Sequence, residues 1–273
     1  MRKVTLAFAL SLLVFGGLLA WLVIDSRAPQ SAKKAPVESL LLYCAANLKV
    51  PAEEVARDYR NSYGVGIQLQ FGGSQTQLTN AQISRRGDLF LPADDSYTEL
   101  ARQKGMIVQS FPLATMHPVL AVKAGNPKNL HSLEDLFREG IQIAQANPDA
   151  AAIGKVTKPV LENAGVWDRL KEHTRVMHLT VIDVANAVKV GSVDAGIVWD
   201  TTIKQVGGLE AVELPVFSGV EAHISVSVLQ SSRHREAAMN FAQYLSASDK
   251  GLKVLDHYGY RVAKGELWES THK

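Results

Sequence analysis

From residue 39 onward, the chain alternates between short apolar segments and segments whose apolar residues recur every three or four positions. Residues 66–71 alternate apolar side chains with glutamine, which is typical of a strand with one buried face. Val55, Tyr59 and Tyr63 instead recur at every fourth position, as on the buried face of a helix. A strand followed by a helix, repeated along the chain, predicts a parallel sheet with helices on both faces.

The predicted elements cover most of the chain after residue 39. Strands are expected at residues 39–43, 66–71, 88–91, 119–122, 141–144, 195–199 and 223–229. Helices are expected around Val55 and Tyr59, with Pro51 in the first turn, at residues 97–104, 133–137, 150–163 and 184–190, and around Ala237 and Phe241.

The order of these elements predicts two α/β lobes, with the second lobe inserted in the first. A chain that returns late to its opening sheet would explain why the C-terminal third is helical. We assign residues 37–120 and 218–273 to the first lobe and residues 121–217 to the second.

The N-terminus carries a signal for export. Arg2 and Lys3 precede an uncharged, mostly apolar run from Val4 to Ile24, and a stretch containing Pro and Lys follows. The run has 21 residues, and about 20 helical residues span a bilayer core. Residues 1–36 are therefore a cleaved signal peptide, or a retained membrane anchor, plus a linker. Either way the protein works outside the cytoplasm, in the periplasm, with residues 4–24 as a candidate tether to the inner membrane.

Composition excludes several classes of function. About 237 residues follow Pro36, which is enough for two lobes with proper cores. The formal net charge is +2 and no dense basic stripe occurs, so nucleic acid is not an expected partner. A single cysteine, Cys44, excludes an internal disulfide framework and a multi-cysteine zinc site. We expect no cofactor.

Two strand ends carry the candidate chemistry. Residues 41–47 and 71–76 each run from an apolar strand into small, hydroxyl or amide side chains, and a helical pattern follows each. Two helix N-termini would thus converge beside neighbouring strand ends. Unpaired backbone N–H groups and the positive end of the helix dipole favour an anion there. The sequence therefore suggests a receptor for a small oxyanion.

Six short motifs resemble, in order and spacing, the molybdate-binding solute receptors of ABC transporters. They are residues 45–48, 71–74, 88–94, 147–149, 196–199 and 257–260, and the similarity spans about residues 40 to 260. The resemblance implies a periplasmic-binding-protein architecture of two lobes joined by a two-segment hinge, near residues 117–122 and 215–223. It implies a molybdate- or tungstate-like oxyanion held in the cleft by neutral donors, delivery to the membrane permease of an ABC importer, and a monomer.

The resemblance also implies which residues bind the ligand. Asn47 stands where the family usually has Ser, and Ser74 falls on a family hydroxyl position. Ile153 and Val181 match positions whose backbone N–H groups face the ligand. Trp199 stands where the family often has a Tyr whose hydroxyl donates. Asn and Trp keep possible donors, an amide NH₂ and an indole N–H, so the pocket's shape differs while its donor character remains.

Structural roles compete with each of these assignments. Ser74 and Asn47 are also good helix N-caps, and Trp199 is also a natural core residue. Gly73 replaces a Ser that is common in the family, which removes a donor beside Ser74. Cys44 is expected to be a small buried hydrophobe, with a soft metal or thiol site as the alternative.

The chain carries no motif that specifies an enzyme. There is no nucleophile elbow, no HExxH and no Walker loop, and the carboxylates Asp183 and Asp200 near the expected cleft lack a nucleophile. The alternatives to an oxyanion receptor are a receptor of the same fold for ferric ion or a small organic acid, and a membrane-anchored sensor or scaffold. Ferric ion would require a cluster of Tyr and carboxylate ligands, whereas Tyr43, Tyr59 and Tyr63 lie on faces expected to be buried.

Overall fold

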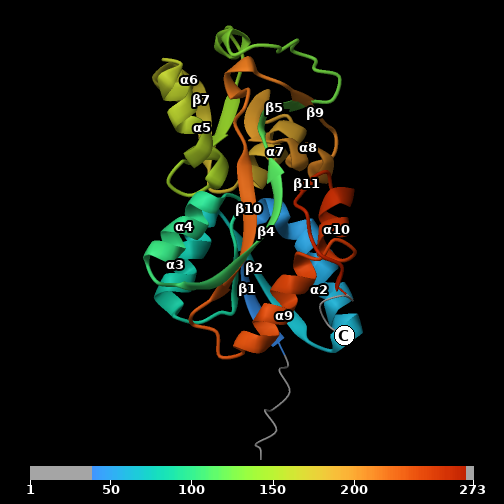
Figure 1. Cartoon of the computed structure of the whole chain (residues 1–273). Coiled ribbons are helices and arrows are strands. Elements are labelled where there is room, and N and C mark those ends of the chain that lie inside the picture. Colours follow the sequence, from blue (N-terminus) through green and yellow to red (C-terminus); the bar gives the residue numbers. More distant parts are fainter. Residues whose placement is uncertain (1–38, 269–273) are drawn as a thin grey trace, which may run out of the picture. The chain divides into compact units, whose positions relative to one another are not determined.

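The computed structural model describes residues 39–268. The described residues belong to one compact unit. The expected signal or anchor at residues 4–24 lies outside the described residues. Two β-sheets with flanking helices make up the described part (Figure 1), so the chain has an α/β fold.

The first sheet, sheet A, is built around β1. Its strand order is β11-β4-β10-β3-β1-β2. β1 is parallel to β2 and β3, whereas β10 is antiparallel to β3 and β4. The strands are β1 (Ser39–Ala45), β2 (Gly66–Gly72), β3 (Leu89–Leu91), β4 (Ile107–Met116), β10 (Ala222–Leu229) and β11 (Arg261–Val262).

The second sheet, sheet B, has the order β7-β6-β8-β5-β9. β6 is parallel to β7 and β8, and β5 is antiparallel to β8 and β9. The strands are β5 (Pro118–Lys123), β6 (Ile143–Ala146), β7 (Thr174–His178), β8 (Ala195–Trp199) and β9 (Leu209–Val212).

Both sheets are therefore mixed, and the expectation of a parallel sheet is wrong. The chain leaves sheet A through β4 and enters sheet B through β5, with only His117 between these two strands. It returns after β9 through β10, which pairs antiparallel with β4 over eight residue pairs. The sequence pattern missed β4 because its burial does not alternate and Pro112 interrupts it. The first connection between the sheets is thus nearly direct, whereas the returning connection contains the 3₁₀ helix η3 (Pro215–Phe217).

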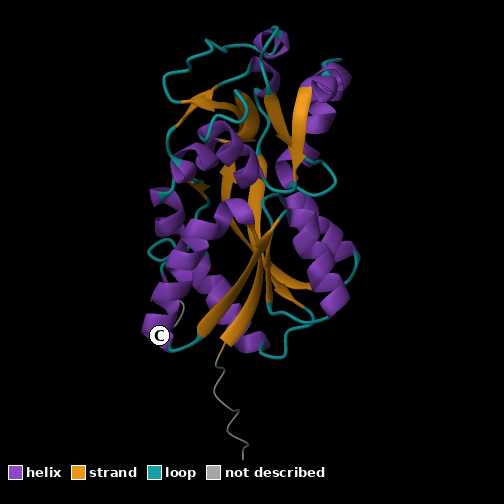
Figure 2. Cartoon of the chain, turned by 180° about the vertical axis from the view of Figure 1, so that it is seen from behind, coloured by secondary structure: helices purple, strands orange, loops and turns teal. Residues whose placement is uncertain are grey.

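Helices cover both faces of sheet A (Figure 2). The α-helices are α2 (Lys49–Tyr63), α3 (Ser74–Ser84), α4 (Asp95–Gln103), α5 (Ala152–Asn163), α6 (Trp167–His173), α7 (Val181–Lys189), α8 (Asp200–Val206), α9 (Arg235–Leu245) and α10 (Gly251–His257). The 3₁₀ helices are η1 (Ala46–Leu48), η2 (Glu134–Phe137) and η3 (Pro215–Phe217). Among residues 39–268, none of the helices combines the length and apolar character needed to cross a bilayer.

The predicted helical face of α2 is mostly correct. Val55 and Tyr59 are buried, as the four-residue spacing indicates, and Tyr43 is buried on β1. Tyr63, at the last turn of α2, is 45 % exposed, so its assignment to a buried face is wrong. Its ring lies 5.8 Å from that of Tyr244 in α9, because the C-terminal end of α2 reaches the surface beside that helix.

Candidate functional site

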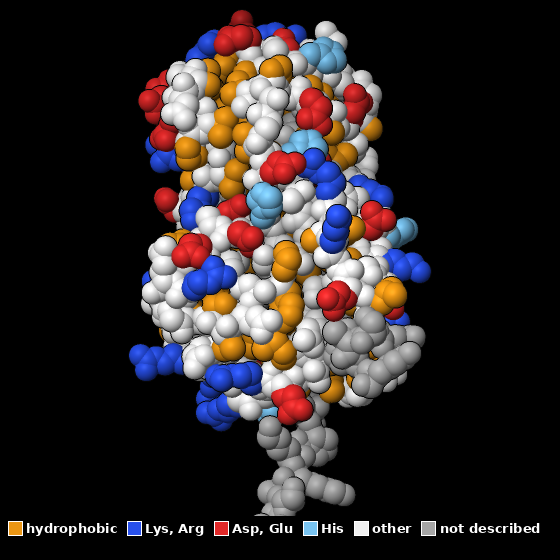
Figure 3. Space-filling model, in the orientation of Figure 1, with side chains coloured by type: hydrophobic (Ala, Val, Ile, Leu, Met, Phe, Trp, Pro, Cys, Tyr) orange, Lys and Arg blue, Asp and Glu red, His pale blue; other side chains and the backbone are white. Residues whose placement is uncertain are grey.

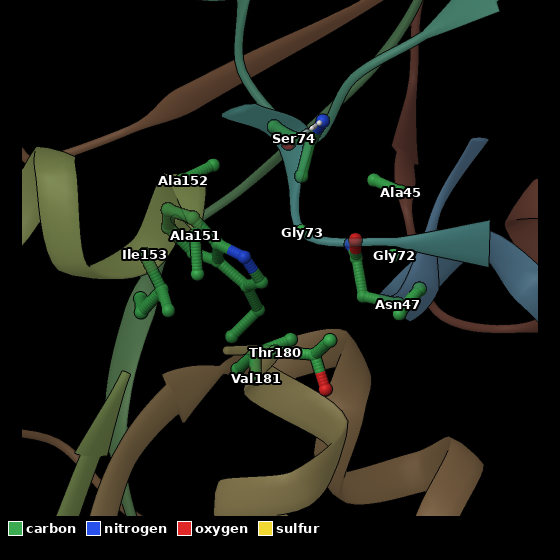
Figure 4. Close-up of a pocket in the computed structure, with 13 residues that line it drawn as sticks. Ala45, Asn47, Gly72, Gly73, Ser74, Ala151, Ala152, Ile153, Thr180 and Val181 are labelled. Atoms are coloured by element: carbon green, nitrogen blue, oxygen red, sulfur yellow. Dashed lines mark hydrogen bonds between the residues drawn. The ribbon is translucent and has the colours of Figure 1, made fainter. Parts of the chain in front are cut away.

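A small cavity lies where the carboxyl ends of β1 and β2 meet the amino ends of α5 and α7 (Figure 4). Its free volume is about 10 Å³, about enough for one water molecule. None of the residues that line it carries a charged side chain. They are Ala45, Ala46, Asn47, Gly72, Gly73, Ser74, Ala93, Ala151, Ala152, Ile153, Thr180, Val181 and Trp199. All five ligand-binding residues predicted from the sequence are among them.

Three α-helices begin at this cavity: α3 at Ser74, α5 at Ala152 and α7 at Val181. The residues preceding α3 and α5 make no side-chain capping hydrogen bond. The first N–H groups of a helix have no acceptor within the helix, and the helix dipole places partial positive charge at the same end. Backbone N–H groups at the starts of α3 and α5 therefore favour an anion here, whereas Thr180 caps α7 by accepting from the Asp183 N–H at 3.2 Å.

Ser74 is not the N-cap residue of α3, and its hydroxyl lines the cavity. It is 1 % exposed and is the first helical residue of α3, so the N-cap position belongs to Gly73. The buried N–H of Ala93 donates to Ser74 Oγ at 3.1 Å (Figure 4). Since this bond uses the oxygen as an acceptor, the hydroxyl proton is free to donate to a group in the cavity.

Asn47 is also not a cap, since neither η1 nor α2 has a side-chain cap. The side chain is 1 % exposed, and its Nδ2 donates to Met116 Sδ at 3.5 Å. The backbone carbonyl of Asn47 accepts from the Tyr260 hydroxyl at 2.8 Å. Thioether sulfur is a weak acceptor, so the amide group loses little if it turns to donate to an anion instead.

Trp199, Ile153 and Val181 complete the predicted set. Trp199 ends β8 and is fully buried, and it makes no side-chain cap for α8. Ile153 is the second residue of α5 and Val181 the first of α7, and both are at most 5 % exposed. Their side chains pack into the core, whereas their backbone N–H groups belong to the first turns, which face the cavity.

Gly73 has a role that the sequence did not indicate. A Cβ atom there would lie 2.5 Å from the carbonyl oxygen of Ala150 and 2.6 Å from that of Leu179. The backbone N–H of Gln75 also donates to the Ala150 oxygen at 3.1 Å. Glycine is thus required by close approach, because the junction of β2 and α3 contacts the segments that lead into α5 and α7.

A side-chain contact joins α5 to α4. The Nζ atom of Lys155 lies 4.2 Å from the centroid of the Tyr97 ring, a cation–π geometry. Burial lowers the pKa of Lys155, and the neighbouring carboxylate of Asp94 acts in the opposite direction. The sequence alone did not indicate a role for Lys155, because Tyr97 and Asp94 lie about sixty positions before it. By contrast, Lys49 is exposed and lies 4.0 Å from the Glu53 carboxylate.

The other candidate groups are held outside the cavity. Burial raises the pKa of the Cys44 thiol well above its usual range, so Cys44 is a buried neutral side chain, as predicted. Asp183 accepts from the Thr180 hydroxyl at 2.6 Å, and Asp200 pairs with the His117 ring at 2.8 Å. Within residues 39–268, no group of three or more His, Cys, Asp or Glu is placed to hold a metal ion.

The arrangement can bind an anion by neutral donors, and it places no nucleophile beside a base in the cavity. A Ser hydroxyl, an amide and the first residues of three helices line one small space. Such donors match an oxyanion and repel a bare cation.

Comparisons with known proteins agree with this geometry. A family model described as bacterial extracellular solute-binding protein matches residues 40–261. The molybdate-binding protein ModA of Mycobacterium tuberculosis is 26 % identical over 268 residues, covering 95 % of this chain and 99 % of the relative.

Solved structures show the same fold at lower identity. The periplasmic molybdate-binding protein of Azotobacter vinelandii is 16 % identical with a TM-score of 0.69, and the match covers 82 % of this chain and 100 % of that one. The sulfate-binding protein SubI of Mycobacterium tuberculosis is 19 % identical with a TM-score of 0.71, covering 83 % and 87 % respectively.

Proposed function

Because this chain belongs to the family of bacterial extracellular solute-binding proteins, which are not enzymes, we propose that it captures a small tetrahedral oxyanion of the molybdate or tungstate kind. It passes the ion to the membrane permease of an ABC importer. The observation that carries this proposal is the convergence of three helix N-termini on a buried cavity without charged side chains. The relative named for molybdate, which matches over nearly its whole length, supports the same ligand class.

Neutral donors are sufficient for such a ligand. A tetrahedral dianion has four oxygens, and each accepts more than one hydrogen bond. Hydrogen bonds to charged groups contribute roughly 1.5–3 kcal/mol each. Several aligned N–H and O–H groups therefore replace the hydration of the ion without a lysine or arginine in the cavity.

We assign the donors as follows. The Ser74 hydroxyl, the Asn47 amide and the Trp199 indole N–H act from side chains. The backbone N–H groups of Ile153 and Val181 act from the starts of α5 and α7. The position of all five residues on one cavity, and the acceptor role that Ala93 already imposes on Ser74 Oγ, support this assignment.

The ligand would bind between two lobes, formed by residues 37–120 with 218–273 and by residues 121–217. The proposed hinge lies near residues 117–122 and 215–223. Sheet A takes its strands from the first group and sheet B from residues 118–212, which supports this division. The family places the protein outside the cytoplasm, as a monomer in our proposal, with residues 4–24 either cleaved or retained as a tether.

A thermal-unfolding panel tests the ligand class. The fragment starting at Val37 is heated with millimolar molybdate, tungstate, sulfate or phosphate, and separately with ferric citrate and small organic acids. An anion at about 100 times its dissociation constant adds about 2.7 kcal/mol of stability, so its midpoint rises. A rise with ferric ion or organic acids alone contradicts the proposal, and no rise with any of them favours a sensor or scaffold.

A further inference from the structure

Cationic side chains gather at the end of sheet A that lies opposite the cavity. The cavity is at the carboxyl ends of β1 and β2, whereas the turns at residues 84–88 and 230–234 lie beside the amino end of β1. Figure 3 shows Lys and Arg side chains at this lower end of the molecule. We call the group the basal basic surface; its members are Arg85, Arg86, Lys104, Arg233, His234 and Arg235.

Two hollows that share Arg85 and Ser231 are lined by five of these six side chains. One is lined by Arg85, Arg86, Arg233 and His234, together with Ser39 at the start of β1. The other is lined by Arg85 and Lys104. Because Arg85 borders both hollows, the cations form one continuous surface that joins the end of α3, the end of α4 and the turn before α9.

These cations are not neutralised locally. Arg85, Arg86 and Arg233 are exposed, and among residues 39–268 none of them forms an ion pair with a carboxylate. Asp88 lies in the first hollow, but its carboxylate accepts hydrogen bonds from the Leu41 N–H at 2.8 Å and the Ser232 hydroxyl at 2.6 Å. The three arginines outnumber the one carboxylate that lines the first hollow, so the hollow has a net positive charge that an anionic partner would neutralise.

The surface also carries an exposed apolar side chain. Ile83, in the last turn of α3, is 77 % exposed and lies two positions before Arg85. An apolar side chain among cations is typical of residues that lie at the boundary of headgroups and acyl chains. Ile83 lines neither hollow, so the arginines carry the proposal and the contribution of Ile83 is tested separately.

The first strand of the described chain begins at the same surface. β1 begins at Ser39, which lines the first hollow, and the apolar run of the N-terminus ends at Ile24. The fourteen residues between them span at most about 50 Å, and they include Arg27, Lys33 and Lys34. A chain tethered by that run would therefore enter the described fold at this surface.

We propose that the basal basic surface binds the phosphate headgroups of anionic phospholipids. Arginine donates two parallel N–H bonds to a phosphate, and each basic side chain near an anionic membrane raises binding by about fivefold. The interaction uses residues that do not line the cavity, so lipid and solute do not compete for the same side chains. It does not depend on which solute the cavity holds.

Vesicle co-sedimentation of the fragment starting at Val37 tests the proposal, because this fragment keeps both sheets and lacks the apolar run. We expect binding to phosphatidylglycerol vesicles at low salt, little binding to phosphatidylcholine vesicles, and release as salt is raised, since ions screen the attraction. The triple variant R85Q/R86Q/R233Q should lower the partition coefficient on the order of 100-fold, and Ile83→Ser should lower it less.

The matched control is K123Q/K171Q/R175Q, which removes the same charge from exposed positions of sheet B and α6. It should bind phosphatidylglycerol vesicles like the unaltered fragment. Circular dichroism and anion-induced stabilisation show whether each variant is folded. Absence of binding by the unaltered fragment, equal binding to both kinds of vesicle, or equal losses in the two triple variants overturns the proposal.

Discussion

At the scale of single residues, the Ser74 hydroxyl combines two roles that can be separated by experiment. Its oxygen accepts from the buried Ala93 N–H, and its proton is available to the ligand. Replacing a hydrogen-bonding group removes one bond to the ligand and leaves one buried donor unsatisfied, and each loss costs roughly 1–3 kcal/mol. Binding and stability therefore report on different bonds of the same side chain.

Ser74→Ala should weaken oxyanion binding by about 1–3 kcal/mol, measured by titration calorimetry. The free energy of unfolding without ligand should also fall, because Ala93 N–H loses its acceptor. Thr76→Ala is the control, since Thr76 lies in the same turn of α3 but is exposed. Unchanged affinity with a large loss of stability would show that Ser74 serves the fold alone.

Gly73→Ala should impair binding for a steric reason. The added Cβ would approach the Ala150 and Leu179 oxygens to 2.5 and 2.6 Å, so the junction of β2 and α3 must move away from the starts of α5 and α7. We expect at least a tenfold loss of affinity, about 1.4 kcal/mol, with a smaller change in stability without ligand, because the segments can separate. Full affinity in this variant would show that the contact at Gly73 plays no part in binding.

At the scale of elements, the sequence predicts local structure better than long-range pairing. The strands at β1, β2, β5, β8 and β10 agree with their apolar patterns, whereas α7 begins at Val181, three residues before the predicted start. β4 was missed because it depends on pairing with β10, more than a hundred residues later. The strand directions were misjudged because β5 also pairs antiparallel with the distant strands β8 and β9. The cavity residues came from local strand-to-helix motifs, whereas Gly73 and Lys155 act through distant segments that no local pattern reveals.

The contact between α5 and α4 predicts a second effect on binding. Lys155→Met removes the cation above the Tyr97 ring and keeps the length of the side chain. A partly desolvated cation–π contact contributes about 1–2 kcal/mol, so the ligand should dissociate about 5- to 30-fold faster. Stopped-flow displacement of the bound anion measures this rate.

Lys158→Met is the matched control for this experiment. Lys158 lies on the same helix, but its Nζ atom is 5.7 Å from the Trp167 ring and pairs with Glu162 within α5. The control should dissociate at the original rate. Equal rates for both variants would show that the α5 to α4 contact does not hold the ligand in place.

At the scale of the whole described part, two chain segments connect sheet A to sheet B, and side-chain contacts link these two segments. His117, between β4 and β5, contacts Glu213 on the returning segment at 3.1 Å. Arg261 of β11 pairs with Glu221 on the same returning segment at 3.0 Å and contacts the His117 ring at 3.1 Å. The two connecting segments are thus linked by these side-chain contacts. We therefore expect a bend in one segment to be accompanied by a bend in the other.

We therefore expect the lobes to close on the ligand by a hinge motion at residues 117–122 and 215–223. Closure excludes water, which strengthens the hydrogen bonds to the anion, and it creates a shape that a permease can distinguish from the empty form. Small-angle scattering should show a smaller radius of gyration when calorimetry confirms saturation with the anion. Gly73→Ala, saturated at a higher anion concentration, should show a smaller decrease because its Cβ keeps the junction of β2 and α3 away from Ala150. An identical radius with and without bound anion would mean that the cavity is rigid and that the contacts at Gly73 and Lys155 exist before the ligand arrives.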